Sequence, residues 1–349
     1  MAALARNPAC RLARHRGPVR RARNRRLQSL LARRSCDNSR AAMRNIKLTL
    51  AYDGSEFSGW QVQPGRPTIQ GVLADVGNKL TQENLQVFGA GRTDAGVHAL
   101  GQVAHFRTQS ALSSAQFQRA FNALLPPAIR VVGAEEVGPD FHARWNAQAK
   151  TYQYRIHRAR VLPPSELRYV LHDPFPLDAH GMARAARLFE GEHDFTSFTA
   201  STGSEEGDRD RSPVREIFSS RLFARKGSFL SAQGFLAATC AEEISAECPA
   251  PEVRGAGPIA SPSGRAVAPA DNFDAGDAVE LIYAVRGKSF LRYMVRKIVG
   301  TLLEVGRGRL APDDIREILD AHDRSRSGPT APPQGLYLVS VEYPEPWKW

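Results

Sequence analysis

The sequence contains little cysteine and no long apolar run. Four of its 349 residues are cysteines, namely Cys10, Cys36, Cys240 and Cys248. All four fall in stretches without a regular pattern, which excludes a disulfide framework or a thiolate zinc site and indicates a reducing compartment. Nowhere do eighteen apolar residues follow one another, so the sequence predicts no membrane-spanning segment.

Outside one segment the sequence also lacks any excess of charge. Residues 1–42 contain twelve arginines, no lysine and one acid, so they account for the whole net charge of +11. Residues 43–349 hold 35 basic and 35 acidic side chains and sum to zero. This balance excludes a uniformly basic nucleic-acid-binding domain, and any polyanion-binding surface must arise from local segregation of charge.

The arginine-rich residues 1–42 show no helical or strand periodicity and are predicted to be a disordered leader. Three interpretations stay open. Translation begins at Met43, just before a strong first strand, and the leader is not made. Alternatively, the leader is an organelle transit peptide, since it is rich in arginine and almost free of acids. Finally, it is an arm that touches RNA. The first interpretation predicts a cytoplasmic protein, and the second predicts an organellar one.

The first half of the remaining chain has the pattern β-α-β-β-α-β. Alternating apolar residues predict strands, and apolar residues at helical spacing predict helices. The predicted strands are 45–52, 85–88, 102–107 and 130–137, and the predicted helices are 69–81 and 114–125. This order is typical of ferredoxin-like domains, an arrangement that RNA-recognition domains also use.

The second half repeats this theme less clearly. The predicted strands are 150–157, 215–225, 277–285 and 336–342, and the predicted helices are 179–190, 290–305 and 313–321. Residues 234–276, with five prolines and five glycines, are predicted to be an irregular surface insertion. We therefore expect an α+β protein with two ferredoxin-like halves, 43–149 and 150–349, whose antiparallel sheets form a central cleft.

A glycine-rich loop between two predicted strands carries the strongest chemical signal. Residues 89–101 contain four glycines, but the loop does not open a helix or carry Lys-Ser/Thr, which argues against a phosphate-binding P-loop. Asp94 is its only acid, which excludes an EF-hand. Arg92 lies two residues before Asp94, on the same side of an extended backbone, and is expected to keep it ionised. Asp94 is thus a candidate nucleophile or general base, and the alternative is an ordinary loop salt bridge.

The apolar segment 290–305 is interrupted by Arg292 and Arg296, four residues apart on one helix face. A guanidinium near a core requires an anionic partner, because leaving it unpaired costs several kcal/mol. The partner is either a nearby acid such as Glu304, or else Asp94 or an RNA phosphate.

Strand 150–157 places Tyr152 and Tyr154 on one face, where they either form part of the core or stack on an RNA base. No acid occurs between residues 141 and 165, so the bases there predict a nucleic-acid-binding surface: Arg144, Lys150, Arg155, Arg158 and Arg160. The histidines show no paired-ligand spacing, and no catalytic metal is expected.

Residues 91–99 (GRTDAGVHA) resemble the signature of the tRNA pseudouridine synthase A family. Further similar motifs follow in the family's order over about residues 44–344: YDG at 52–54, GWQ at 59–61, FHAR at 141–144, YQY at 152–154, DFTSF at 194–198, MVRKIVG at 294–300 and GLYLV at 335–339. The leader and the insertion are departures from the family's pattern.

The resemblance implies an isomerase that converts uridine to pseudouridine at positions 38, 39 and 40 of the tRNA anticodon stem-loop. It implies a homodimer that needs neither cofactor nor metal. Asp94 matches the essential aspartate, Arg92 the arginine that holds the flipped nucleotide, Tyr152 the tyrosine packed on the target base, and Arg296 the arginine paired with the aspartate. The alternative is a non-catalytic tRNA- or RNA-binding module, and a hydrolase using Asp94 is disfavoured because no second acid or base accompanies it in the loop.

Overall fold

The computed structural model describes residues 42–199, 212–226, 242–244 and 278–344, and residues 43–349 belong to one compact unit. The leader 1–42, except for Ala42, and most of the insertion 234–276 lie outside the described residues, so the expectations for them stay predictions. Within the described part the fold is mixed, with five α-helices and one large, mostly antiparallel sheet. None of the helices in the described residues combines the length and the hydrophobicity that a membrane-spanning helix needs.

The first half contains the predicted elements in the predicted order, although its second strand is short and shares only Phe88 with the predicted range 85–88. They are β1 (Arg44–Tyr52), α2 (Ile69–Thr81), β2 (Phe88–Gly89), β3 (His98–Thr108), α3 (Ser114–Leu124) and β4 (Ile129–Val137). Strand β1 lies between β3 and β4 and is antiparallel to both, and β2 pairs with β3. The third predicted strand, 102–107, in fact begins four residues earlier and extends the glycine-rich loop directly into the sheet.

Local sequence explains why the helices of this half begin where they do. Thr68 caps α2, its hydroxyl accepting a hydrogen bond from the Gly71 amide. Ser113 and Gln116 form a reciprocal capping box at the start of α3. The apolar residues of α2 are buried at the predicted helical spacing, so both helices are fixed by signals readable in the sequence.

The second half contributes seven strands and three helices to the described part of the chain. They are β5 (Ala149–His157), β6 (Leu171–His172), α4 (Ala179–Arg187), β7 (Gly191–Asp194), β8 (Val214–Lys226), β9 (Glu242–Glu243), β10 (Ala278–Gly287), α5 (Met294–Gly306), α6 (Asp314–Ala321) and β11 (Leu336–Glu342). Helix α4 packs against both α5 and β8. Short 3₁₀ turns cover Pro164–Glu166, Thr196–Phe198 and Pro333–Gly335.

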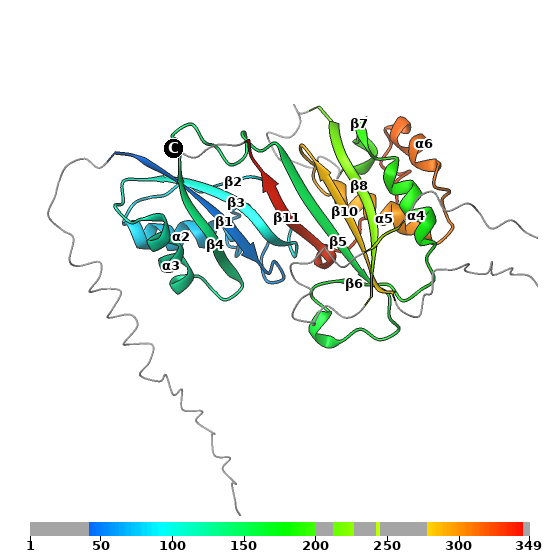
Figure 1. The fold of residues 1–349 in the computed structure, drawn as a ribbon, viewed down its shortest axis with the longest axis horizontal. Coiled ribbons are helices and arrows are strands. Elements are labelled where there is room, and N and C mark those ends of the chain that lie inside the picture. The colour runs from blue at the N-terminus through cyan, green and yellow to red at the C-terminus, as the bar shows by residue number, and fades with distance from the viewer. Residues whose placement is uncertain (1–41, 200–211, 227–241, 245–277, 345–349) are drawn as a thin grey trace, which may run out of the picture. The chain divides into compact units, whose positions relative to one another are not determined.

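The two halves share one continuous sheet, where the sequence analysis expected a separate sheet for each. The strand order is β4-β1-β3-β11-β5-β10-β8-β7, with the C-terminal strand β11 in the middle (Figure 1). Strand β11 is parallel to β3 and antiparallel to β5, and so satisfies the free backbone groups of both edges. The loop before β3 is thereby held close to the elements of the second half.

Helix α5 begins at Met294 and not at residue 290 as expected. Tyr293, at its N-cap, has a φ of 62°, a left-handed conformation that a helix cannot include. Residues 288–293 therefore form a non-helical entry segment, which ends in a turn at 292–293, and Phe290 and Arg292 lie on this entry segment.

Candidate active site

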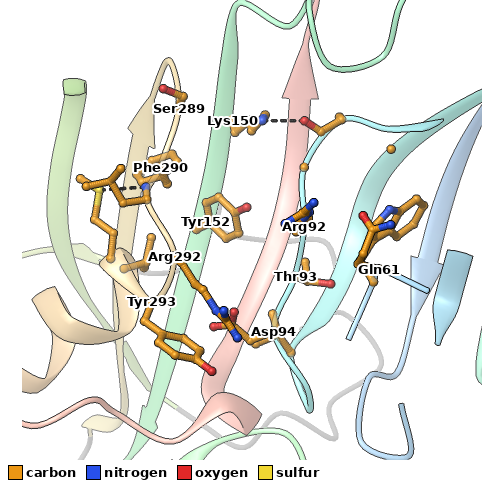
Figure 2. Close-up of a pocket in the computed structure, with 18 of the residues that line it drawn as sticks. Gln61, Arg92, Thr93, Asp94, Lys150, Tyr152, Ser289, Phe290, Arg292 and Tyr293 are labelled. Atoms are coloured by element: carbon orange, nitrogen blue, oxygen red, sulfur yellow. Dashed lines mark hydrogen bonds between the residues drawn. The ribbon is translucent and has the colours of Figure 1, made fainter. Parts of the chain in front are cut away.

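A cavity of about 1630 Å³ lies where the two halves meet. Its walls are the glycine-rich loop after β2, the start of β5, and the entry segment of α5. Figure 2 shows Asp94 and Arg92 on one side of this space, Tyr152 on β5, and Phe290, Arg292 and Tyr293 on the other side.

The charge of the cavity contrasts with the neutral balance of residues 43–349. Among the described residues that line it, the only acidic one is Asp94. The basic ones are Arg66, Arg92, Arg144, Lys150, Arg215, Lys288, Arg292, Arg296 and Arg324. This is the local segregation of charge that a polyanion-binding surface requires in a protein without net charge.

Asp94 is held by a firmly anchored loop. The hydroxyls of Thr93 and Tyr52 share a buried hydrogen bond of 2.8 Å, and the Trp60 amide donates to the Thr93 carbonyl at 3.0 Å. The Val97 amide donates to the carbonyl of Asp94 itself at 3.1 Å. Thr93 is buried, its neighbours Arg92 and Asp94 are more exposed, and all three line the cavity.

Arg296 is the guanidinium that contacts Asp94. Its Nη1 lies 3.2 Å from Asp94 Oδ2, and the two side chains are 13% and 21% exposed. Arg296 Nε donates to the Ala331 carbonyl at 2.7 Å, and the Ala331 amide donates to the Arg296 carbonyl at 3.1 Å. Glu304, the alternative partner, pairs instead with Arg307 and Arg309.

Burial raises the pKa of Asp94, although the charges of Arg296 and Arg292 and the hydrogen bond from Arg296 lower it. Arg296 and Arg292 supply charge that favours the ionised form of Asp94, and the expectation that Arg92 does so stays a prediction. Their guanidiniums lie 5.0 and 5.2 Å from the Tyr293 ring centre. The left-handed backbone at Tyr293 thus places two cations beside one carboxyl.

Tyr152 and Tyr154, expected on one face of the strand, have different environments. Tyr152 lines the cavity and meets the Phe290 ring edge-on at 5.1 Å. Burial raises the pKa of Tyr152, with the charge of Asp94 adding to the effect, so its hydroxyl stays protonated at neutral pH. Tyr154 is buried and donates to the Pro332 carbonyl at 2.8 Å, as a core residue does.

The basic run 144–160 does not form one surface, which corrects the sequence interpretation. Arg144 and Lys150 line the cavity, but Arg155 is buried and pairs with Glu280, as Arg225 also does. The reason is that residues on both faces of β5 are buried, so alternation along the strand does not bring its cations to one exposed surface.

Lys150 is a residue whose role the sequence analysis missed. It is buried, its Nζ donates to the Ala90 carbonyl at 2.7 Å, and burial lowers its pKa to about 8. The sequence pattern placed Lys150 among the cations of a surface, because alternation along β5 does not reveal its contact with the Ala90 carbonyl. Nor could the sequence have revealed the left-handed Tyr293. Among the described residues, no three His, Cys, Asp or Glu side chains are grouped so as to hold a metal ion.

The cationic cavity around one carboxyl suits an enzyme whose substrate is a polyanion. The chain belongs to the tRNA pseudouridine synthase family, whose model matches residues 49–146 and 185–344. It is 44% identical over 302 residues to tRNA pseudouridine synthase A of Solibacter usitatus, covering 86% of this chain and 100% of the relative. Over 301 residues it is 38% identical to the enzyme of that name from Caldicellulosiruptor saccharolyticus and 37% identical to tRNA pseudouridine synthase A 1 of Desulfotalea psychrophila, with the same coverage.

Proposed function

We propose that this protein isomerises uridine to pseudouridine in the anticodon stem-loop of tRNA, at positions 38, 39 and 40, with Asp94 as the essential nucleophile. The observation that carries this proposal is the pairing of Asp94 with Arg296 in a cavity whose other charged lining residues are basic in the described part of the chain. Membership of the family supplies the substrate and the reaction.

The isomerisation of uridine requires one carboxylate, and in our proposal Asp94 supplies it. Asp94 begins cleavage of the bond between C1′ and N1, and the freed uracil turns and rejoins C1′ through C5. The hydrogen at C5 leaves as a proton while N1 gains one, so substrate and product are isomers. The reaction therefore needs no oxidant, reductant or transferred group.

Extruding a nucleotide from a stem costs a few kcal/mol, and the cavity offers groups that offset this. In our proposal Arg92, exposed on the loop, holds the flipped nucleotide in place. The ring of Tyr152, whose hydroxyl is protonated, packs on the target base, and the Phe290 ring contacts the Tyr152 ring edge-on. Arg296 fixes the direction of the Asp94 carboxylate through its second bond to Ala331.

We also propose that the fold consists of two ferredoxin-like halves. The first half supports this with its β-α-β-β-α-β order and with β1 between β4 and β3, β2 being paired on the far side. The homodimer and the cytoplasmic location belong to the same proposal. Sedimentation of the purified protein tests the first, and localisation of a tagged full-length chain tests the second.

Tritium release from tRNA labelled at C5 of uridine tests the enzymatic function. The wild-type protein should release tritium, whereas Asp94→Asn should bind the tRNA and release none. Asp75→Asn is the matched control, because Asp75 is exposed on α2 and does not line the cavity. A wild-type protein that binds tRNA without releasing tritium would instead be a non-catalytic RNA-binding module.

A further inference from the structure

A cluster of aromatic side chains lies at the cavity, beyond the residues assigned to the target uridine. Phe88, His142 and Trp145 line the same cavity as Asp94. The Phe88 and His142 rings are 5.4 Å apart, and those of His142 and Trp145 are 5.6 Å apart. Trp145 is 69% exposed, an unusual position for the largest aromatic side chain.

The backbone turn that carries Trp145 is tightly bonded. The His142 amide donates to Asn146 Oδ1 at 2.6 Å, and the Asn146 amide donates to the His142 carbonyl at 3.1 Å. His142 Nδ1 accepts from the amides of Arg144 and Trp145 at 3.1 and 3.3 Å. The indole is thus presented to the cavity by a pre-formed turn, which reduces the entropy lost when a ligand binds to it.

The chemistry of this cluster is that of a stacking surface with an anion site beside it. The guanidinium carbon of Arg144 lies 5.1 Å from the Trp145 ring centre. Burial, followed by the charge of Arg144, lowers the pKa of His142, so its ring is neutral at pH 7 and behaves as an aromatic surface. Flat rings beside a guanidinium suit an unstacked nucleobase and its phosphate.

The cavity has room for such a second group. Its volume of about 1630 Å³ exceeds the roughly 300–1,000 Å³ of sites that enclose a drug-sized ligand. One flipped uridine against Tyr152 therefore leaves a large part of the cavity empty. The basic lining continues around this part, which favours another segment of the same RNA over an apolar protein surface.

We propose that Trp145, together with Phe88, His142 and Arg144, forms a second stacking site for an unpaired base of the substrate tRNA, separate from the target uridine. The identity of the RNA rests on the proposed function. The site itself rests on the exposed indole carried by a hydrogen-bonded turn, the adjacent guanidinium, and the shared cavity.

Binding of a transcribed tRNA by the full-length protein tests this site. Stacking on an aromatic side chain contributes enough that Trp145→Ala should weaken tRNA binding by about 5- to 100-fold. It should raise KM and leave kcat at saturating tRNA within about threefold, because the target uridine is bound elsewhere. Trp145→Phe retains a stacking ring and should bind within about threefold of wild type. Phe175→Ala should bind as wild type does, because Phe175 is similarly exposed, at 67%, but lines a different cavity.

Fluorescence gives a direct readout of contact with the base. The indole emission of the wild type should be quenched when tRNA binds, and most of this quenching should be absent from Trp145→Phe. Unchanged tRNA binding by Trp145→Ala would overturn the stacking site, even if tritium release proved the enzyme active. Dissociation of a dimer by Trp145→Ala, seen in sedimentation without RNA, would also overturn it, because Trp145 would then contact a second copy. Failure of the wild type to release tritium would refute the proposed reaction alone, since the binding comparison does not depend on turnover.

Discussion

At the scale of the residue, Asp94 is placed where folding opposes its ionised form. Burial raises the pKa of its carboxyl more than the charges of Arg296 and Arg292 lower it. A carboxyl whose pKa is higher in the folded state favours folding when it is protonated, below its unfolded pKa. This contribution is lost as the pH rises through the folded pKa. At neutral pH the ionised Asp94 carboxylate therefore lowers the stability of the protein.

Asp94→Asn should consequently be at least as stable as the wild type while losing activity by more than about 10³-fold. The amide oxygen still accepts the hydrogen bond from Arg296, which also keeps its bond to the Ala331 carbonyl, and the carboxylate charge no longer has to be buried. Thermal unfolding at pH 7 checks this prediction, with Asp75→Asn as the exposed control. A clear fall in Tm for Asp94→Asn alone would mean that its ion pair with Arg296 stabilises the fold.

The raised pKa of Asp94 also predicts how enzymatic activity falls at acidic pH. As the pH falls, kcat/KM should decrease when Asp94 is protonated, and the midpoint should lie above the ordinary aspartate value of 3.8. Single-turnover tritium release across pH 4 to 7 measures it, with tRNA binding measured at each pH as the control. A midpoint at or below 3.8 would contradict the dominance of burial.

Lys150 also predicts a dependence of stability on pH, but here burial lowers the pKa, whereas it raises the pKa of Asp94. Burial lowers the pKa of Lys150 to about 8, so in the folded state it loses its proton before the unfolded chain does. Between pH 8 and 10 the unfolded state binds more protons, and the free energy of unfolding therefore rises with pH, by at most about 3 kcal/mol. Denaturant unfolding at both pH values should show this rise in the wild type and its loss in Lys150→Met. An equal rise of the unfolding free energy from pH 8 to pH 10 in both proteins would contradict the lowered pKa of Lys150.

At the scale of the element, α5 positions Arg296 through close contact with the segment 328–331. Gly300 lies against the backbone of Pro329, where an added Cβ would overlap the carbonyl group. The Gly328 amide donates to Thr301 Oγ1 at 2.9 Å in the same contact. The segment also carries Ala331, whose carbonyl accepts from Arg296, so helix packing and site geometry are coupled here.

Gly300→Ala should therefore reduce both stability, by about 1–3 kcal/mol, and kcat, because the displaced segment pulls the Ala331 carbonyl away from Arg296. Gly133→Ala is the matched control, since its Cβ would meet Thr49 at an ordinary 3.6 Å. Chemical denaturation and single-turnover rates measure the two effects. Lost stability with an unchanged rate would show that α5 holds Arg296 without this segment.

Helix α2 was predictable because its signals are local: a capping Thr68 followed by apolar residues at helical spacing. The start of α5 was not, because the left-handed Tyr293 breaks an apolar pattern that itself continues. Arg155 was wrongly assigned to a surface, since its burial depends on Glu280, a residue 125 positions away. Local patterns cannot report such pairings, whereas the resemblance to a family correctly placed Arg296 beside Asp94.

At the scale of the whole molecule, strand β11 is the element that makes one site from two halves. It pairs with β3, which follows the loop of Asp94, and with β5, which carries Tyr152. Asp94 and Tyr152 therefore lie on opposite sides of a strand that comes late in the sequence. Sequence periodicity predicted this strand but not its place in the sheet, because pairing with β3 spans more than two hundred residues.

We expect that the insertion between β8 and β10 is not needed for activity, since its described residues 242–244 do not line the cavity. The two strands are antiparallel neighbours, and Lys226 faces Ala278 in their register, so a two-residue Asn-Gly turn can replace residues 227–277. The shortened protein should keep kcat/KM within about threefold. It should lose about 1–3 kcal/mol of stability, because the deletion removes Ile244, which is buried in the core.

Tritium release and denaturant unfolding of the shortened protein measure these two quantities, and Ile244→Ala in the full-length chain serves as the control for the stability loss. The two variants should lose stability by similar amounts, since Ile244 is the buried apolar residue that the deletion takes from the described core. A folded but inactive shortened protein would contradict the prediction. It would show that tRNA binding or turnover depends on residues between the two strands, and that the sheet with its central strand is not sufficient for the reaction.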